Sequence, residues 1–187
     1  MKEDKIFSIR SMVFMAIFAA IMCICGPISV PLPGLVPISL GTFAIYLAGA
    51  VLGKKRASIA VGLYVLLGLV GLPVFTLGRG GFSALIGVTG GYIVGFVPMV
   101  LIIGIFADMK TSSHWAMIPG MVIGTAVMYT SATAWYMVVM GSALVPALMA
   151  CVVPFLIGDS IKIVCATALA MPLKSRLNSI MYNHRES

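Results

Sequence analysis

The chain contains 187 residues, of which 61% are hydrophobic and only 9% are charged, and its mean hydropathy is +1.14. Such a composition excludes a soluble globular domain and predicts an integral membrane protein, because one helical span needs about 20 mostly apolar residues. The net charge of +7 does not indicate nucleic-acid binding, since the positions of the basic residues explain it as a topology signal.

Apolar segments along the chain are separated by stretches that are charged or rich in glycine and proline, which break helices. Six such segments are the simplest count. We therefore expect a single membrane domain over residues 1–187, folded as an all-α bundle of six transmembrane helices. The approximate spans are 8–25, 38–53, 57–72, 91–107, 115–140 and 146–172.

The distribution of basic residues predicts the orientation of this bundle. Ten of the twelve lysines and arginines fall before the first span, between spans two and three, after span four or at the end of the chain. Under the positive-inside rule, these segments and both termini are cytoplasmic in a multi-pass protein of the cell (plasma) membrane. The ten residues are Lys2, Lys5, Arg10, Lys54, Lys55, Arg56, Lys110, Lys174, Arg176 and Arg185.

The first expected span carries a stripe of small residues. Ala16 and Ala20 are four residues apart, with Ala19 between them, and small residues at this spacing let another helix approach closely. The stripe serves either packing within the bundle or an external protein partner, and the pattern by itself leaves both open.

Two of the loops expected on the outer side are unusual in composition. Residues 26–37 contain too much proline for a helix and too many apolar residues for a solvated linker. Residues 73–90 place glycines around a cation and an aromatic side chain. Non-helical backbone at the membrane is tolerated where it is buried or lines a cavity, so both loops are candidate lids over a pocket. The residues singled out around the second loop are Arg79, Phe82, Thr89, Gly90, Gly91 and Tyr92.

The last expected span contains a charged pair, Asp159 and Lys162, which share one face of a helix. A charged side chain at the centre of a bilayer costs roughly 2.5–3.5 kcal/mol, so the two persist only if they neutralise each other, line a polar cavity or hold a ligand. Together with Arg79 they suit a small, acidic, amide-like ligand. This arrangement requires Pro154 to open or kink the last helix, because otherwise Asp159 lies roughly 20 Å below its outer end.

Two other interpretations of the charged pair are open. In one, Asp159 and Lys162 only neutralise each other, and Arg79 is a loop residue near lipid phosphates. In the other, Asp159 carries protons or ions in a secondary transporter or channel. The sequence has no nucleotide-binding loop, Ser/His/Asp arrangement or HExxH motif, so we do not expect an enzyme. The cysteines lack the neighbours that a metal site needs.

Four sequence blocks together resemble the BioY family, which supplies the biotin-binding S components of energy-coupling factor (ECF) transporters. The resemblance extends over nearly the whole chain, and the combination of a central glycine-rich block with a terminal G-D-x-x-K is specific. The chain departs from the family pattern at Gly41, where many members have glutamine, and at Val88, where proline is common. The blocks are Gly71-Leu72-Pro73-Val74-Phe75, Gly78-Arg79-Gly80-Gly81, Thr89-Gly90-Gly91-Tyr92-Ile93-Val94-Gly95-Phe96 and Gly158-Asp159-Ser160-Ile161-Lys162.

This resemblance implies an S-component fold that binds biotin from outside, with biotin as ligand and without a cofactor or metal. Asp159 is then expected to accept from the ureido N–H groups, Lys162 to donate to the ureido oxygen, and Arg79 to bind the carboxylate, although the last two roles are exchangeable. The further substrate-binding candidates are Thr42, Phe82, Thr89, Gly90, Gly91 and Tyr92.

The resemblance also implies protein partners, namely a transmembrane coupling subunit and two ATPase subunits. It assigns the small residues Ala16, Ala19 and Ala20 to the surface that docks on the coupling subunit. The alternative function is an ion-coupled secondary transporter or channel in which Asp159 is the carrier.

Overall fold

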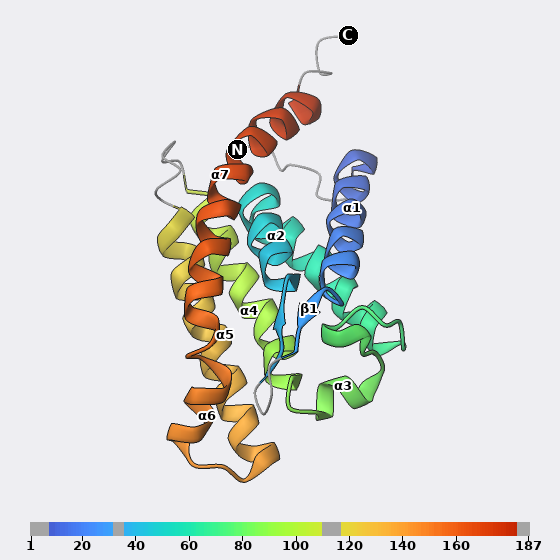
Figure 1. Cartoon of the computed structure of the whole chain (residues 1–187). Coiled ribbons are helices and arrows are strands. Elements are labelled where there is room, and N and C mark those ends of the chain that lie inside the picture. The colour runs from blue at the N-terminus through green and yellow to red at the C-terminus, as the bar shows by residue number, and fades with distance from the viewer. Residues whose placement is uncertain (1–7, 32–35, 110–116, 183–187) are drawn as a thin grey trace.

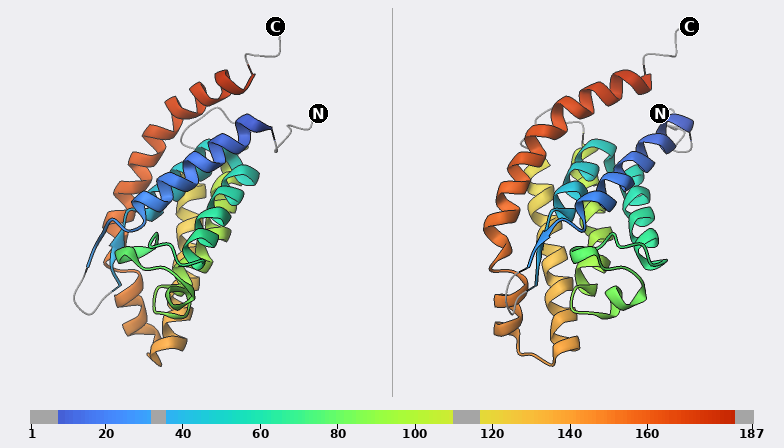
Figure 2. Two further views of the ribbon diagram at one scale, coloured as in Figure 1. Left: turned by 90° about the vertical axis from the view of Figure 1, so that its right-hand side faces the viewer. Right: turned by 45° about the vertical axis from the view of Figure 1, so that its right-hand side comes forward.

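The computed structural model describes residues 8–31, 36–109 and 117–182, and the side chains as far as residue 177. Long helices run roughly along one axis, and the start of α1 lies at the same end of the molecule as the end of α7 (Figures 1 and 2). The helices are α1 Ile9–Cys25, α2 Gly41–Leu69, α3 Phe82–Ile86, α4 Gly90–Ala107, α5 Met117–Met140, α6 Leu144–Cys151 and α7 Phe155–Tyr182.

Helix α2 is broken at Gly53, where φ is +73° and ψ is 175°. Its first residue, Gly41, and its later residue Tyr64 both lie against Gly26, so the second part of α2 folds back beside the first. The carboxylate of Asp108 accepts a hydrogen bond from Lys54 N at 3.1 Å, which caps the second part of the helix. The two spans predicted at 38–53 and 57–72 therefore correspond to the two helical parts of α2, which meet at Gly53.

Helix α4 lies at the centre of the bundle and packs against both α2 and α5. Glycines permit these close approaches: Gly49 of α2 lies against Ile103, and Gly95 of α4 lies against Met128 and Ser131. The core consists of apolar side chains from all the long helices. Many large apolar residues nevertheless face outward, as in Ile157, which is 77% exposed, and this is the surface expected of a protein surrounded by lipid.

Three helices among the described residues are long and apolar enough to cross a membrane: Gly90–Ala107, Met117–Met140 and Phe155–Leu177. Helix α1, at 17 residues, is apolar but shorter. The count of six spans and the cytoplasmic position of the termini stay predictions. Among the basic residues on which that orientation depends, Lys2, Lys5, Lys110 and Arg185 lie outside the described residues.

The last predicted span, 146–172, is divided between two helices at Pro154, where the sequence predicts that the helix opens or kinks. Helix α6 ends at Cys151, a turn occupies residues 152–154, and α7 begins at Phe155, directly after Pro154. Proline lacks the N–H that a helix interior needs but is compatible with a helix start. Asp159 consequently lies about one turn into α7, which is the arrangement that a pocket reachable from that end of the helix requires.

The two loops that were predicted to cover a pocket pack against each other. The first loop contains two short strands that pair antiparallel as a hairpin, β1 Ser29–Val30 and β2 Ile38–Ser39. The second loop contains the 3₁₀ helix Thr76–Gly78, and Leu77 N donates to Ser29 Oγ at 3.0 Å. Tyr64 OH donates to Val74 O at 3.2 Å and so joins the second loop to α2.

Candidate functional site

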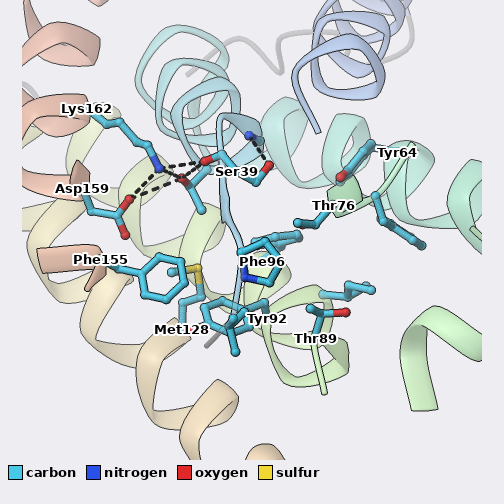
Figure 3. Close-up of a pocket in the computed structure, with 16 residues that line it drawn as sticks. Ser39, Tyr64, Thr76, Thr89, Tyr92, Phe96, Met128, Phe155, Asp159 and Lys162 are labelled. Atoms are coloured by element: carbon cyan, nitrogen blue, oxygen red, sulfur yellow. Dashed lines mark hydrogen bonds and ion pairs between the residues drawn. The ribbon is translucent and has the colours of Figure 1, made fainter. Parts of the chain in front are cut away.

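A pocket lies between the two loops and helices α2, α4, α5 and α7 (Figure 3). The space between these elements amounts to roughly 540 Å³ when the open solvent at its mouth is included. Most of its lining is apolar or aromatic, with a few polar groups. The lining residues are Val36, Pro37, Ser39, Gly41, Thr42, Tyr64, Phe75, Thr76, Thr89, Tyr92, Ile93, Phe96, Met128, Phe155, Asp159 and Lys162.

The charged pair predicted from the sequence forms part of this lining. Lys162 Nζ lies 2.8 Å from Asp159 Oδ1, and the two residues are 9% and 2% exposed, respectively. A buried ion pair is tolerated when further hydrogen bonds satisfy both partners. Those bonds come from elements far away in the sequence.

The ammonium group of Lys162 uses all of its hydrogen-bond donors in the structure. Besides Asp159, Nζ donates to Ser39 O at 2.7 Å and to Thr42 Oγ1 at 2.9 Å (Figure 3). Because an ammonium has three N–H groups and no acceptor, an incoming ligand that accepts from Lys162 must replace one of these partners.

Tyr129 of α5 satisfies the second oxygen of the carboxylate. Its hydroxyl donates to Asp159 Oδ2 at 2.6 Å, and Tyr129 itself is 8% exposed. The sequence analysis missed this residue, because a single tyrosine in a membrane span carries no local sign of its partner. Its spacing of four residues from Thr125, another buried polar residue of α5, is the signal that marks the inner face of this helix.

Ser39, also missed, connects the pair to the hairpin and to two helix ends. Its carbonyl accepts from Lys162, its hydroxyl donates to Gly26 O at 2.7 Å, and the same hydroxyl accepts from Gly41 N at 2.9 Å. The sequence analysis placed Ser39 inside a span, which concealed its position in β2. Ser39 therefore connects Lys162 with the hairpin, the end of α1 and the start of α2.

Aromatic side chains form much of the apolar wall. Tyr64 and Phe75 meet edge to face with ring centroids 5.5 Å apart, and the rings of Tyr92 and Phe155 are 5.7 Å apart. The Tyr92 hydroxyl donates to Cys151 O at 2.5 Å, so Tyr92 offers the pocket mainly its ring. Such a wall suits a flat or aliphatic ligand portion.

Some of the substrate-binding candidates line the pocket and some do not. Those that do are Asp159, Lys162, Thr42, Thr89 and Tyr92, whereas Arg79, Phe82, Gly90 and Gly91 are outside the lining.

The candidates outside the lining have other surroundings. Phe82 is 64% exposed. Gly90 and Gly91 are buried at the contact with α5, where a Cβ on Gly91 would come within 2.7 Å of Ser131 O. These two glycines permit close helix packing, which the sequence pattern does not distinguish from close approach to a ligand.

Arg79 has an exposed side chain and does not belong to the pocket lining. Its backbone oxygen accepts from Phe75 N at 2.9 Å, and its backbone N donates to Thr76 O at 3.4 Å. Both of those neighbours line the pocket. The backbone of Arg79 therefore adjoins two residues of the pocket wall, whereas Asp159 and Lys162 belong to the lining itself.

The small-residue stripe on α1 is divided between two environments. Ala16 and Ala20 are exposed, whereas Ala19 is 4% exposed and packs inside the bundle. The surface that an external partner can reach therefore contains Ala16 and Ala20, and Ala19 does not belong to it.

A metal site is not indicated by the described part of the chain. Within residues 8–31, 36–109 and 117–177, no three His, Cys, Asp or Glu side chains come together as ligands. The pocket offers one carboxylate, one ammonium and hydroxyl groups, which suit an organic ligand with donors and acceptors.

The model of the BioY family matches residues 1–179. The chain belongs to the BioY family. It is 38% identical over 165 residues to the biotin transporter BioY of Thermotoga maritima, an alignment that covers 88% of this chain and 96% of the relative. It is 31% identical over 173 residues to the biotin transporter BioY of Rhodobacter capsulatus, covering 86% and 91%.

A solved structure also resembles this BioY family member along nearly its whole length. The crystal structure of the S-component for biotin from an ECF-type ABC transporter superposes with a TM-score of 0.83 at 25% sequence identity, covering 94% of this chain and 95% of that chain. The family resemblance read from the four sequence blocks is thus confirmed. BioY relatives are transport proteins, in agreement with the expectation that the chain is not an enzyme.

Proposed function

We propose that this chain is the biotin-binding S component of an ECF-type transporter. The observation that carries the proposal is the self-neutralised Asp159–Lys162 pair inside an aromatic pocket, in a family whose named relatives are biotin transporters. Biotin combines a ureido group, which has both N–H donors and a carbonyl acceptor, with an apolar bicycle and chain and a terminal carboxylate. The ureido group and the apolar parts have counterparts in the pocket lining, and Arg79, outside the lining, is the counterpart proposed for the carboxylate.

The buried pair is the proposed clamp for the ureido group. Asp159 accepts from a ureido N–H, and Lys162 donates to the ureido oxygen in place of Ser39 O or Thr42 Oγ1. Hydrogen bonds that involve a charged partner are shorter and stronger than neutral ones, so this exchange is favourable when the ligand carbonyl is well placed. The bicycle and chain lie along the aromatic wall.

Arg79 is proposed as the partner of the carboxylate. Lys162 is 9% exposed and lines the pocket, whereas Arg79 is exposed and lies outside the lining, and a carboxylate is costly to bury without full pairing. This difference supports the assignment of the ureido oxygen to Lys162 and of the carboxylate to Arg79, rather than the reverse.

The proposed transport unit is a complex in the cell membrane. The chain crosses the membrane six times with both termini in the cytoplasm, binds biotin from outside, and delivers it inward with a transmembrane coupling subunit and two ATPase subunits. The absence of a nucleotide-binding loop from the sequence means that ATP hydrolysis must come from the partners. Ala16 and Ala20 form the proposed docking surface.

Substitution of Asp159 tests this function. Asp159→Asn removes the charge that pairs with Lys162, and truncating one partner of a desolvated pair costs about 2–5 kcal/mol. Calorimetry on the purified protein in detergent is expected to give tight biotin binding by the wild type and affinity lower by a factor of tens or more in the variant. Asp108→Asn, at the cap of Lys54, is the control and should bind as the wild type does. Equal affinity in Asp159→Asn would refute the assignment of the clamp.

A further inference from the structure

Tyr129 contacts the charged pair without belonging to the pocket lining. Its hydroxyl donates to Asp159 Oδ2 at 2.6 Å, but the residues that line the pocket do not include it. The phenol comes from α5, the carboxylate from α7, and the two positions are 30 residues apart in sequence. The contact therefore acts on Asp159 and not directly on a ligand.

The two oxygens of Asp159 have different partners, and this difference fixes the carboxylate. Oδ1 accepts from Lys162 at 2.8 Å, while Oδ2 accepts from Tyr129. A carboxylate held at both oxygens cannot rotate without losing a charge-assisted hydrogen bond. Each oxygen can accept two hydrogen bonds; Oδ1 also accepts from Thr42 Oγ1 at 3.5 Å, so a lone pair stays free on Oδ2.

Removal of the phenol would leave Oδ2 without its donor in a site that is 2% exposed. The carboxylate could then turn toward Lys162 with both oxygens, and the orientation presented to a ligand N–H would be lost. Unsatisfied polar groups in buried sites are costly. The free energy needed to restore the orientation of the carboxylate would therefore be lost from the free energy of ligand binding.

We propose that Tyr129 is a positioning residue that holds the Asp159 carboxylate in the orientation that accepts a ligand N–H. The proposal rests on the assignment of this pocket to biotin under the proposed function, and it adds a residue of α5 that does not touch the ligand.

A double-mutant cycle tests the proposal, because it separates action through Asp159 from a general structural effect. Biotin affinity is measured by calorimetry for the wild type, Tyr129→Phe, Asp159→Asn and the double variant. Tyr129→Phe is expected to weaken binding about ten-fold, as the loss of a hydrogen bond to a charged group does. In the Asp159→Asn background the same change should weaken binding less than about two-fold, because the charge that the phenol orients is absent.

Tyr46→Phe is the matched control. Tyr46 is fully buried, its hydroxyl bonds to Thr125 Oγ1 at 2.6 Å, and it does not line the pocket. Tyr46→Phe therefore removes a buried hydroxyl but no hydrogen bond to Asp159 or Lys162. The biotin affinity of this variant should equal that of the wild type. Size-exclusion chromatography and melting temperature check folding, and Tyr129→Met replaces Tyr129→Phe if the latter does not fold.

The outcomes separate this proposal from the proposed function. Tight binding by the wild type, with a ten-fold loss in Tyr129→Phe that disappears in the Asp159→Asn background, supports both. A loss of equal size in both backgrounds, or no loss at all, overturns the positioning role and leaves biotin binding intact. No biotin binding by the wild type overturns the proposed function itself.

Discussion

Arg79 and Lys162 are both cations, but they lie in different surroundings. Lys162 is buried and its ammonium already has three acceptors, so it suits a single carbonyl oxygen that takes the place of one of them. Arg79 is exposed, and its planar guanidinium grips a carboxylate with two parallel N–H groups. The proposed role of Arg79 can therefore be tested by changing the carboxylate of the ligand as well as the side chain of the protein.

Arg79→Ala should weaken biotin binding about five-fold, which corresponds to about 1 kcal/mol for an exposed ion pair. The variant should bind biotin methyl ester as well as the wild type does, because the ester has no carboxylate. Calorimetry with both ligands measures the difference, and Lys55→Ala, which removes an exposed cation elsewhere, controls for net charge. An equal loss for biotin and its ester would show that Arg79 does not bind the carboxylate.

At the scale of the elements, the break in α2 depends on one glycine. Gly53 has φ of +73°, and a Cβ there would come within 2.1 Å of Asp108 Oδ1. That carboxylate in turn caps the second part of the helix at Lys54. The break thus lets a single helix place Thr42 and Tyr64, from its two parts, on the same pocket.

Gly53→Ala should destabilise the protein by about 1–2 kcal/mol or more, through a left-handed backbone that alanine disfavours and through the clash with Asp108. The melting temperature in detergent is the measurement. Gly62→Ala is the control, because Gly62 lies in the same helix with no atom near a Cβ, and alanine is a better helix former by about 1 kcal/mol. A Gly53→Ala protein that melts no lower than Gly62→Ala would contradict this account of the break.

For the molecule as a whole, α1 presents a face on which small residues are exposed. Ala16 and Ala20 are accessible, while Ala19, Met15 and Met22 attach the helix to the bundle. Neither Ala16 nor Ala20 lines the pocket. Ligand binding and docking on a partner should therefore be separable by mutation.

Ala16→Leu combined with Ala20→Leu should leave biotin affinity unchanged and abolish stable co-purification with the coupling subunit and ATPases, since the added side chains prevent close helix approach. Biotin uptake should fall with complex formation. The control combines Ala126→Leu and Ala134→Leu, two exposed alanines of α5. Full uptake by the α1 variant, or uptake in vesicles that lack any ATPase, would favour the ion-coupled alternative.

The sequence alone predicts the charged pair well, because two charges in an apolar segment are conspicuous and need an explanation. It also predicts the effect of Pro154, since proline lacks a backbone donor. It does not predict Tyr129 or Ser39, whose hydroxyl and carbonyl acquire their roles only through contacts with α7. Nor does it distinguish glycines that approach a ligand from Gly90 and Gly91, which approach another helix.

The three occupied donors of Lys162 also bear on which molecules the pocket rejects. A fatty acid also offers an apolar chain to the aromatic wall and a carboxylate to a cation such as Arg79. With its carboxylate at Arg79, however, a fatty acid has no carbonyl flanked by N–H groups at its other end. It cannot replace an acceptor that Lys162 loses, and it places an apolar chain beside Asp159 where a donor is needed. Under the proposed function, selectivity would come from an exchange of hydrogen bonds, in which a urea-like head supplies an acceptor to Lys162 and a donor to Asp159.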